Sequence, residues 1–178
     1  MKLLRTIRLD PSDTFVFERA AEPGEWAVSG GFAFVDADPG QLPAKARAAF
    51  RGGFLGVDSL GWSTLVQIVE ASEEDRAAVV DALARRLVER FGAPDLGAAR
   101  PAAEEEVAFA ASLTDHPPDT LIAVHRTRED GAIRETFRTL RPRQGEKPLR
   151  AFAFMEVDGE EEPGETVDLA GLAHGARK

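Results

Sequence analysis

The chain has 178 residues and no cysteine, which excludes disulfides, thiolate metal sites and cysteine nucleophiles. This length fits one domain with a core large enough to fold unaided. The net charge is −9 and no basic cluster appears, so nucleic acid is not expected as a partner. No apolar run reaches the length of a membrane span, and we expect a cytoplasmic protein that binds no membrane.

The N-terminal part of the chain is expected to form an antiparallel meander. Three segments carry the apolar and β-branched residues typical of strands, and turn residues separate them. The predicted strands are residues 2–9, 14–18 and 26–35. Gly30 and Gly31 interrupt the third segment, which indicates a bulge, a bend or the close approach of another backbone.

A short helix is predicted over residues 42–51, and a glycine-rich loop follows it at residues 52–61. Phosphate-binding loops follow a strand and open a helix, whereas this loop precedes a strand. It also lacks a Gly-Lys-Ser/Thr signature. We therefore interpret the loop as a connector in preference to a nucleotide site.

The clearest pattern in the chain is a strand followed by an amphipathic helix. A β-branched run over residues 63–69 predicts the strand. Ser72 and Asp75 predict a capping box at the start of a helix over residues 73–91. The apolar stripe of this helix consists of Val80, Leu83, Ala84, Leu87 and Phe91.

The second half of the chain predicts a helix and a hairpin. A linker at residues 95–101 precedes a helix over 102–113, and a rigid proline-containing connector follows at 114–119. Asp130-Gly131 is the strongest short hairpin signal in the chain and predicts a two-residue turn. The strands on either side of this turn are residues 121–128 and 133–140.

The hairpin turn fixes the register of its two strands. The predicted cross-strand pairs are Glu129 with Ala132, Arg126 with Glu135, His125 with Thr136, and Val124 with Phe137. Alternation then assigns the apolar residues to a core face, namely Ile122, Val124, Ile133 and Phe137. The solvent face carries Ala123, His125, Thr127, Arg134, Thr136 and Arg138.

Two groups of polar residues are candidate sites. His125, Arg134 and Arg138 lie together on the solvent face of the predicted hairpin, where cations can hold a carboxylate or phosphate. The simpler interpretation, which we favour, is a solvated face with cross-strand pairs.

The second group is Asp115, His116 and Asp119, in which the histidine could act as a base or metal ligand. Its simpler interpretation is a polar turn in which Asp119 caps a strand. Only His125 and His174 remain as histidines, and no pair has the i, i+4 spacing of a helical metal site. We therefore predict no metal, no cofactor and no catalytic residue.

Three segments resemble an uncharacterised bacterial family of unknown function. They are Lys2–Asp10, Trp26–Phe34 and Gly53–Gly56, and the resemblance covers about the first 140 residues. It implies an accessory role, associated with genes for molybdenum and iron–sulfur oxidoreductases such as formate dehydrogenases. The resemblance assigns no catalytic residue.

We expect a single α+β domain over residues 1–157, with an antiparallel or mixed sheet of five to seven strands. Two longer helices and one short helix complete it. An acidic tail over residues 158–178, expected to be mobile, holds six acidic and two basic residues. The predicted function is a non-catalytic accessory or protein-interaction domain with a protein partner. The alternative is a small-molecule or anion-binding protein, possibly an enzyme, that uses the 121–140 hairpin or the His116 turn.

Overall fold

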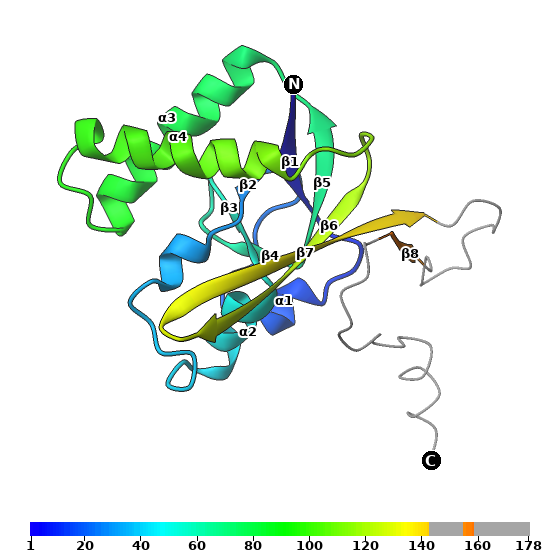
Figure 1. The fold of residues 1–178 in the computed structure, drawn as a ribbon, viewed down its shortest axis with the longest axis horizontal. Coiled ribbons are helices and arrows are strands. Elements are labelled where there is room, and N and C mark those ends of the chain that lie inside the picture. The colour runs from blue at the N-terminus through cyan, green and yellow to red at the C-terminus, as the bar shows by residue number, and fades with distance from the viewer. Residues whose placement is uncertain (143–154, 159–178) are drawn as a thin grey trace.

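The computed structural model describes residues 1–142 and 155–158. Its strands form one curled antiparallel sheet in the order β4-β3-β2-β1-β5-β6-β7-β8 (Figure 1). The strands are β1 (Lys2–Ile7), β2 (Trp26–Val28), β3 (Phe54–Gly56), β4 (Trp62–Ser63), β5 (Leu65–Glu70), β6 (Leu121–Glu129), β7 (Ala132–Pro142) and β8 (Met155–Asp158). The first seven build a half-barrel, and β8 pairs with the outer edge of β7. The expected α+β domain is confirmed.

Four α-helices and one 3-10 helix accompany the sheet in the described residues. They are α1 (Asp13–Val16), the 3-10 helix η1 (Gly31–Phe34), α2 (Ala44–Gly52), α3 (Glu73–Arg90) and α4 (Leu96–Ser112). The two longest, α3 and α4, pack against each other, and α4 also contacts β1 and β2. An ion pair of 2.6 Å between Arg100 and Asp81 joins them at their exposed side. No helix in the described ranges has the length and apolar content needed to cross a bilayer.

Two apolar clusters form the interior. The larger lies between the sheet and the α3–α4 pair, and it buries four members of the predicted stripe: Val80, Leu83, Ala84 and Leu87. The fifth, Phe91, follows the end of α3 and is 37% exposed. The smaller cluster contains Phe17, Phe34, Ala49 and Phe50, and Trp62 packs against both clusters.

The local sequence signals are confirmed. The Ser72 hydroxyl accepts a hydrogen bond from the Asp75 backbone at 3.0 Å, and the Asp75 carboxylate accepts one from the Ser72 backbone at 2.8 Å. Asp130 and Gly131 both have positive φ, at 50° and 78°, as a type I′ turn requires. Every predicted hairpin pair occurs in the observed register.

The predicted strand at residues 14–18 is wrong, because this segment begins with the single helical turn α1. The Val16 backbone donates to the Ser12 carbonyl and the Phe17 backbone to the Asp13 carbonyl. The buried carboxylate of Asp13 fixes the turn, since it accepts hydrogen bonds from the backbone and hydroxyl of Thr64 at 3.0 and 2.5 Å. A contact 51 residues distant therefore decides the local conformation.

The third predicted strand, residues 26–35, ends at Val28. Gly30 has a φ of 80°, in the left-handed region that favours glycine, and η1 begins at the next residue. Side chains, and not another backbone, approach Gly30 closely, because a Cβ atom there would lie 2.7 Å from the Leu55 Cβ.

Three further segments differ from the expectation. The glycine-rich segment contains the buried strand β3, and the predicted strand at 63–69 is divided into β4 and β5. Helix α4 starts at Leu96, so Pro101 lies inside it. The Asp95 carboxylate caps this early start by accepting a hydrogen bond from the Ala98 backbone at 2.8 Å.

The chain also covers the edge of the sheet at β4. The Trp62 backbone donates to the Arg19 carbonyl, and the Ala21 backbone donates to the Trp62 carbonyl, both at 2.9 Å. At the other edge, the predicted strand over 151–157 is described only from Met155 onward. The predicted tail lies, apart from Asp158, outside the described residues.

Candidate functional site

The hairpin places its predicted cations as the register requires. His125, Arg134 and Arg138 are all exposed on the solvent face of β6 and β7. The Arg134 guanidinium, however, forms an ion pair of 2.7 Å with the Glu129 carboxylate, which fits the interpretation as a solvated face with cross-strand pairs. An anion site at these three residues stays a prediction.

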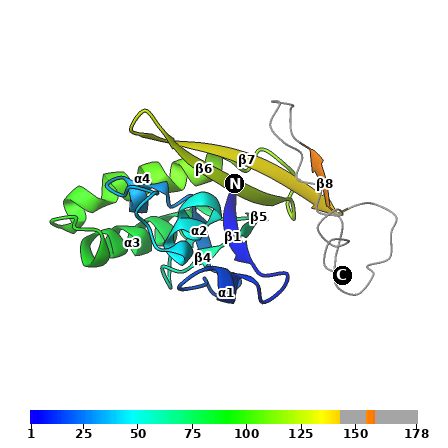
Figure 2. The ribbon, with the colours of Figure 1, turned by 90° about the horizontal axis from the view of Figure 1, so that it is seen from below.

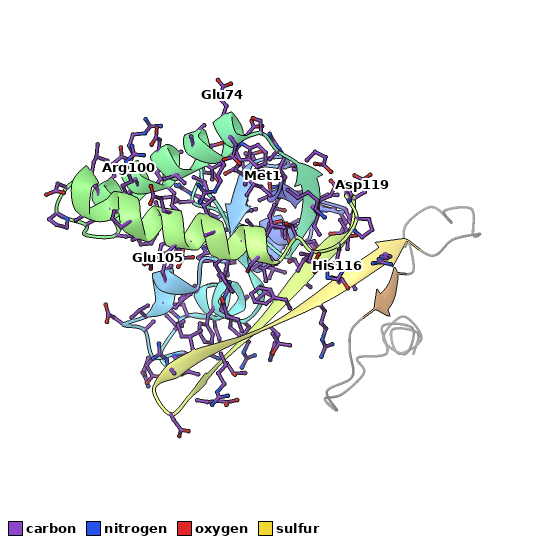
Figure 3. All side chains as sticks on the ribbon, turned by 45° about the horizontal axis from the view of Figure 1, so that its top comes forward. Met1, Glu74, Arg100, Glu105, His116 and Asp119 are labelled. Atoms are coloured by element: carbon purple, nitrogen blue, oxygen red, sulfur yellow. The ribbon has the colours of Figure 1, made fainter. Side chains whose placement is uncertain are left out.

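The connector between α4 and β6 holds the second predicted group (Figure 3). The Asp119 carboxylate accepts a hydrogen bond of 2.7 Å from the Gln67 amide, and its backbone donates to the Ile68 carbonyl. The His116 carbonyl accepts a hydrogen bond of 2.6 Å from Lys2, and Asp115 is exposed. These contacts are those of a polar turn that leads into β6 and pairs with β5. Within the described ranges, no group of three or more potential metal ligands lies close together.

The most deeply buried charge in the described part of the molecule is Arg126, whose residue is 1% exposed. Its Nε donates to the Glu135 carboxylate at 2.6 Å. One terminal nitrogen donates to the Gly53 carbonyl at 2.7 Å and the Phe50 carbonyl at 3.1 Å, and the other to the carbonyl of Ser29. Burial lowers the pKa of Arg126, and the hydrogen bond to Glu135 opposes that shift.

This network holds together segments that are distant in sequence. Arg126 binds the carbonyls at the C-terminal end of α2, where the helix dipole favours a cation. The Ser29 hydroxyl donates to Glu135, so the segment before η1 is tied to β7 as well. Arg128, also on β6, donates to the carbonyls of Phe34 and Val35 at 2.8 and 3.0 Å. Two arginines of one strand thus position η1 and α2.

A second carboxylate, Glu106 of α4, lies beside this network. Its burial raises its pKa from 4.5 to about 7, the charge of Glu135 adds to the rise, and the positive charge of Arg126 opposes it. The adjacent Glu105 on the same helix adds a smaller rise. Glu106 therefore titrates close to neutral pH.

The glycine-rich loop uses its own backbone donors. The buried carboxylate of Glu25 accepts hydrogen bonds from the backbones of Asp58 and Ser59 at 3.1 and 2.9 Å. Gly56 makes room for this carboxylate, because a Cβ atom there would lie 2.6 Å from it. The backbone N–H groups that a phosphate would need are thus already bound, which supports the interpretation as a connector.

A hollow of about 670 Å³ opens between α2, η1 and the end of α3. Figure 2 views the molecule from the side on which α1, α2 and β4 lie. Its apolar lining consists of eight residues: Ala33, Phe34, Ala46, Ala49, Leu55, Leu60, Trp62 and Phe91. Its charged lining consists of Glu18, Arg19, Lys45 and Arg90.

Glycines make the floor of this hollow possible. The indole ring of Trp62 lies over Gly30 and Gly53, where added Cβ atoms would come within 2.9 and 2.8 Å of it. The ring also packs on Phe34, with the centroids 5.1 Å apart. The Trp62 ring therefore packs closely against the backbone at Gly30 and Gly53. It is half-buried, and it lines the hollow.

The sequence interpretation did not identify the hollow or the Arg126 network. The predicted register contained one usable signal, since it paired Arg126 with Glu135 and alternation puts both on the face of Val124. The hollow has no comparable signal, because its lining comes from six separate segments of the chain. None of the predicted site residues lines it.

The Arg126 network leads to a stability prediction. Replacing Arg126 by Met leaves the Glu135 carboxylate without its cation, although the Ser29 hydroxyl still donates to it, and removes a donor from the carbonyls of Ser29, Phe50 and Gly53. We expect the free energy of unfolding to fall by about 3–5 kcal/mol in urea titrations. The exposed Arg134→Met variant is the control and should lose less than about 1 kcal/mol. Equal losses in the two variants would contradict the structural role of Arg126.

Glu106 leads to a pH prediction. Because its pKa is higher in the folded chain than the ordinary value of 4.5, the folded state binds the extra proton between pH 4.5 and about 7. Stability should therefore fall as the pH rises through that window and then level off. The Glu106→Gln variant should lose this fall, whereas the exposed Glu105→Gln variant should keep it. Thermal melts from pH 4.5 to 8 measure the difference, and identical profiles for all three proteins would refute the assignment.

Comparisons with known proteins identify a family but not an activity. No curated protein and no solved structure matches the chain. The model of a family of unknown function matches residues 1–158, which is most of the chain and includes the three segments that carry the resemblance noted above. The expected membership of an uncharacterised family is confirmed. The chain belongs to DUF6505, a family of unknown function.

Proposed function

We propose that this domain binds a small organic molecule in the hollow beside Trp62 and carries out no catalysis of its own. The observation that carries the proposal is the aromatic and aliphatic lining, in which Trp62, Phe34 and Leu55 meet at one place. Pockets for small molecules are concave, mostly apolar and about 300–1,000 Å³ in volume. The hollow of about 670 Å³ fits a molecule of one to three rings.

The composition of the lining favours binding over catalysis. Covalent catalysis needs a nucleophile and a base within hydrogen-bonding reach of each other. The lining of the hollow, as far as the structure describes the chain, contains no serine, threonine or histidine. Its acid, Glu18, is exposed, and its other charged groups are cations.

The site is also built for a fixed shape. Arg126 and Arg128 hold α2 and η1 from behind, and both of these elements contribute to the lining. A pre-formed wall lowers the ordering cost of binding, so a modest apolar contact area can give measurable affinity.

Binding to the hollow can be tested with the neutral fluorescent probe N-phenyl-1-naphthylamine. The chain has two tryptophans, so the Trp26→Phe variant leaves Trp62 as the reporter. The probe should bind with one-to-one stoichiometry, gain fluorescence and quench the Trp62 emission. Ala46→Phe, which fills the hollow, should weaken binding by about tenfold or more.

Ala102→Phe is the matched control for that test. Ala102 lies on the exposed side of α4 and does not line the hollow, so the variant should bind the probe as the parent protein does. Absence of probe binding, or equal loss in the two variants, would contradict the proposal.

A second candidate function is that of an accessory protein with a protein partner, as the family resemblance implies. It is favoured by three exposed apolar side chains near α1: Leu9, Phe15 and Val16, with Phe15 73% exposed. Apolar side chains scattered singly over a surface need no partner, but three within eight residues indicate a contact surface. The partner would be a component or maturation factor of a molybdenum or iron–sulfur oxidoreductase.

The accessory role is tested by affinity purification of tagged protein followed by mass spectrometry. The Phe15→Asp variant should lose an oxidoreductase component that the unmodified protein retains. Leu96→Asp is the control, because Leu96 is exposed and belongs to a different element, as the first residue of α4. Capture of the same proteins by both variants would argue against a docking surface at α1.

A further inference from the structure

The charges around the hollow differ from those of the chain as a whole. The complete chain has 31 acidic and 22 basic residues. The lining of the hollow contains the cations Arg19, Lys45 and Arg90 and a single acid, Glu18. An acidic protein thus presents a locally cationic rim beside an apolar floor, which favours a negatively charged ligand there.

These cations are not neutralised by the protein. Arg19 donates to the Ser59 carbonyl at 3.0 Å, a neutral acceptor. Lys45 and Arg90 form no ion pair or hydrogen bond with any residue that the structure describes. The acid next to Arg90 in sequence, Glu89, is paired with Arg86 at 3.1 Å instead. Two exposed cations on opposite elements, α2 and α3, therefore remain available to a ligand.

We infer that the ligand of the hollow is an organic anion: its apolar body lies against Trp62, and its carboxylate, sulfonate or phosphate group is bound by Lys45 and Arg90. The inference rests on the proposed function and adds the charge class of the ligand. Arginine offers a planar fork of donors to such groups, and lysine offers a compact positive charge. The apolar floor supplies contact area and the cationic rim supplies orientation.

Two dyes that differ by one charge test this inference. 1-Anilinonaphthalene-8-sulfonate is N-phenyl-1-naphthylamine with an added sulfonate, so their dissociation constants compare an anion with its neutral counterpart. Two unit charges 4 Å apart attract by about 1 kcal/mol in water, so two cations should favour the sulfonate by about tenfold or more at low salt. Added 0.5 M sodium chloride should reduce that preference, because it screens exposed charges.

Variants assign the preference to the hollow. The double variant Lys45→Gln, Arg90→Gln should lose the preference for the sulfonate, so that the two dyes bind it with about equal affinity. The matched double variant Arg134→Gln, Arg138→Gln removes the same net charge from the hairpin and should keep the preference. All four side chains are exposed, so neither variant is expected to unfold. Loss of the preference in the hairpin variant alone would overturn the inference and favour the anion site predicted there.

The outcomes separate this inference from the proposed function. If the neutral dye binds in the hollow and the sulfonate binds no more tightly, the charge class is wrong and the binding site stands. If neither dye binds, the proposed function fails and the inference with it. Displacement of the bound sulfonate by 2-naphthoate or 2-naphthyl phosphate supports an anionic ligand, whereas equal displacement by 2-naphthol overturns it.

Discussion

A guanidinium group removed from water is stable only where hydrogen bonds and an opposite charge replace its hydration. Arg126 meets this condition through Glu135 and through carbonyls of α2 and of the segment before η1. The same bonds bring these segments to the hairpin, so the arginine sets where they lie. The walls of the hollow depend on them, and the proposed ligand site is therefore positioned by Arg126, which is not part of its lining.

Local chemistry explains what the sequence could predict. The Asp130-Gly131 turn selects its own backbone conformation, and strand alternation then extends the register along both strands. Helix α3 begins where Ser72 and Asp75 satisfy the free backbone groups of its first turn. Its stripe is buried because the spacing of Leu83 and Leu87 places both on one side of the helix.

Contacts between residues distant in the chain explain what the sequence could not predict. The segment after Asp13 has the composition of a strand, but two hydrogen bonds from Thr64 to the Asp13 carboxylate hold it in a helical turn. Pro101 suggests a helix boundary, yet Asp95 starts α4 earlier and the buried Ala99 and Ala103 keep it packed. The backbone carbonyls that Arg126 binds lie 73 to 97 residues away, and no periodic pattern encodes such separations.

The short strand β4 has a consequence for association between molecules. A free sheet edge offers a row of backbone donors and acceptors to which another chain can add a strand, a common route to aggregation. Here the segment around Ala20 uses the outward groups of Trp62 itself, with a parallel bridge between the two residues. The β4 edge beside the hollow is therefore not available for strand addition. The aromatic hollow can be open to solvent there without making this edge a site of strand-to-strand association between molecules.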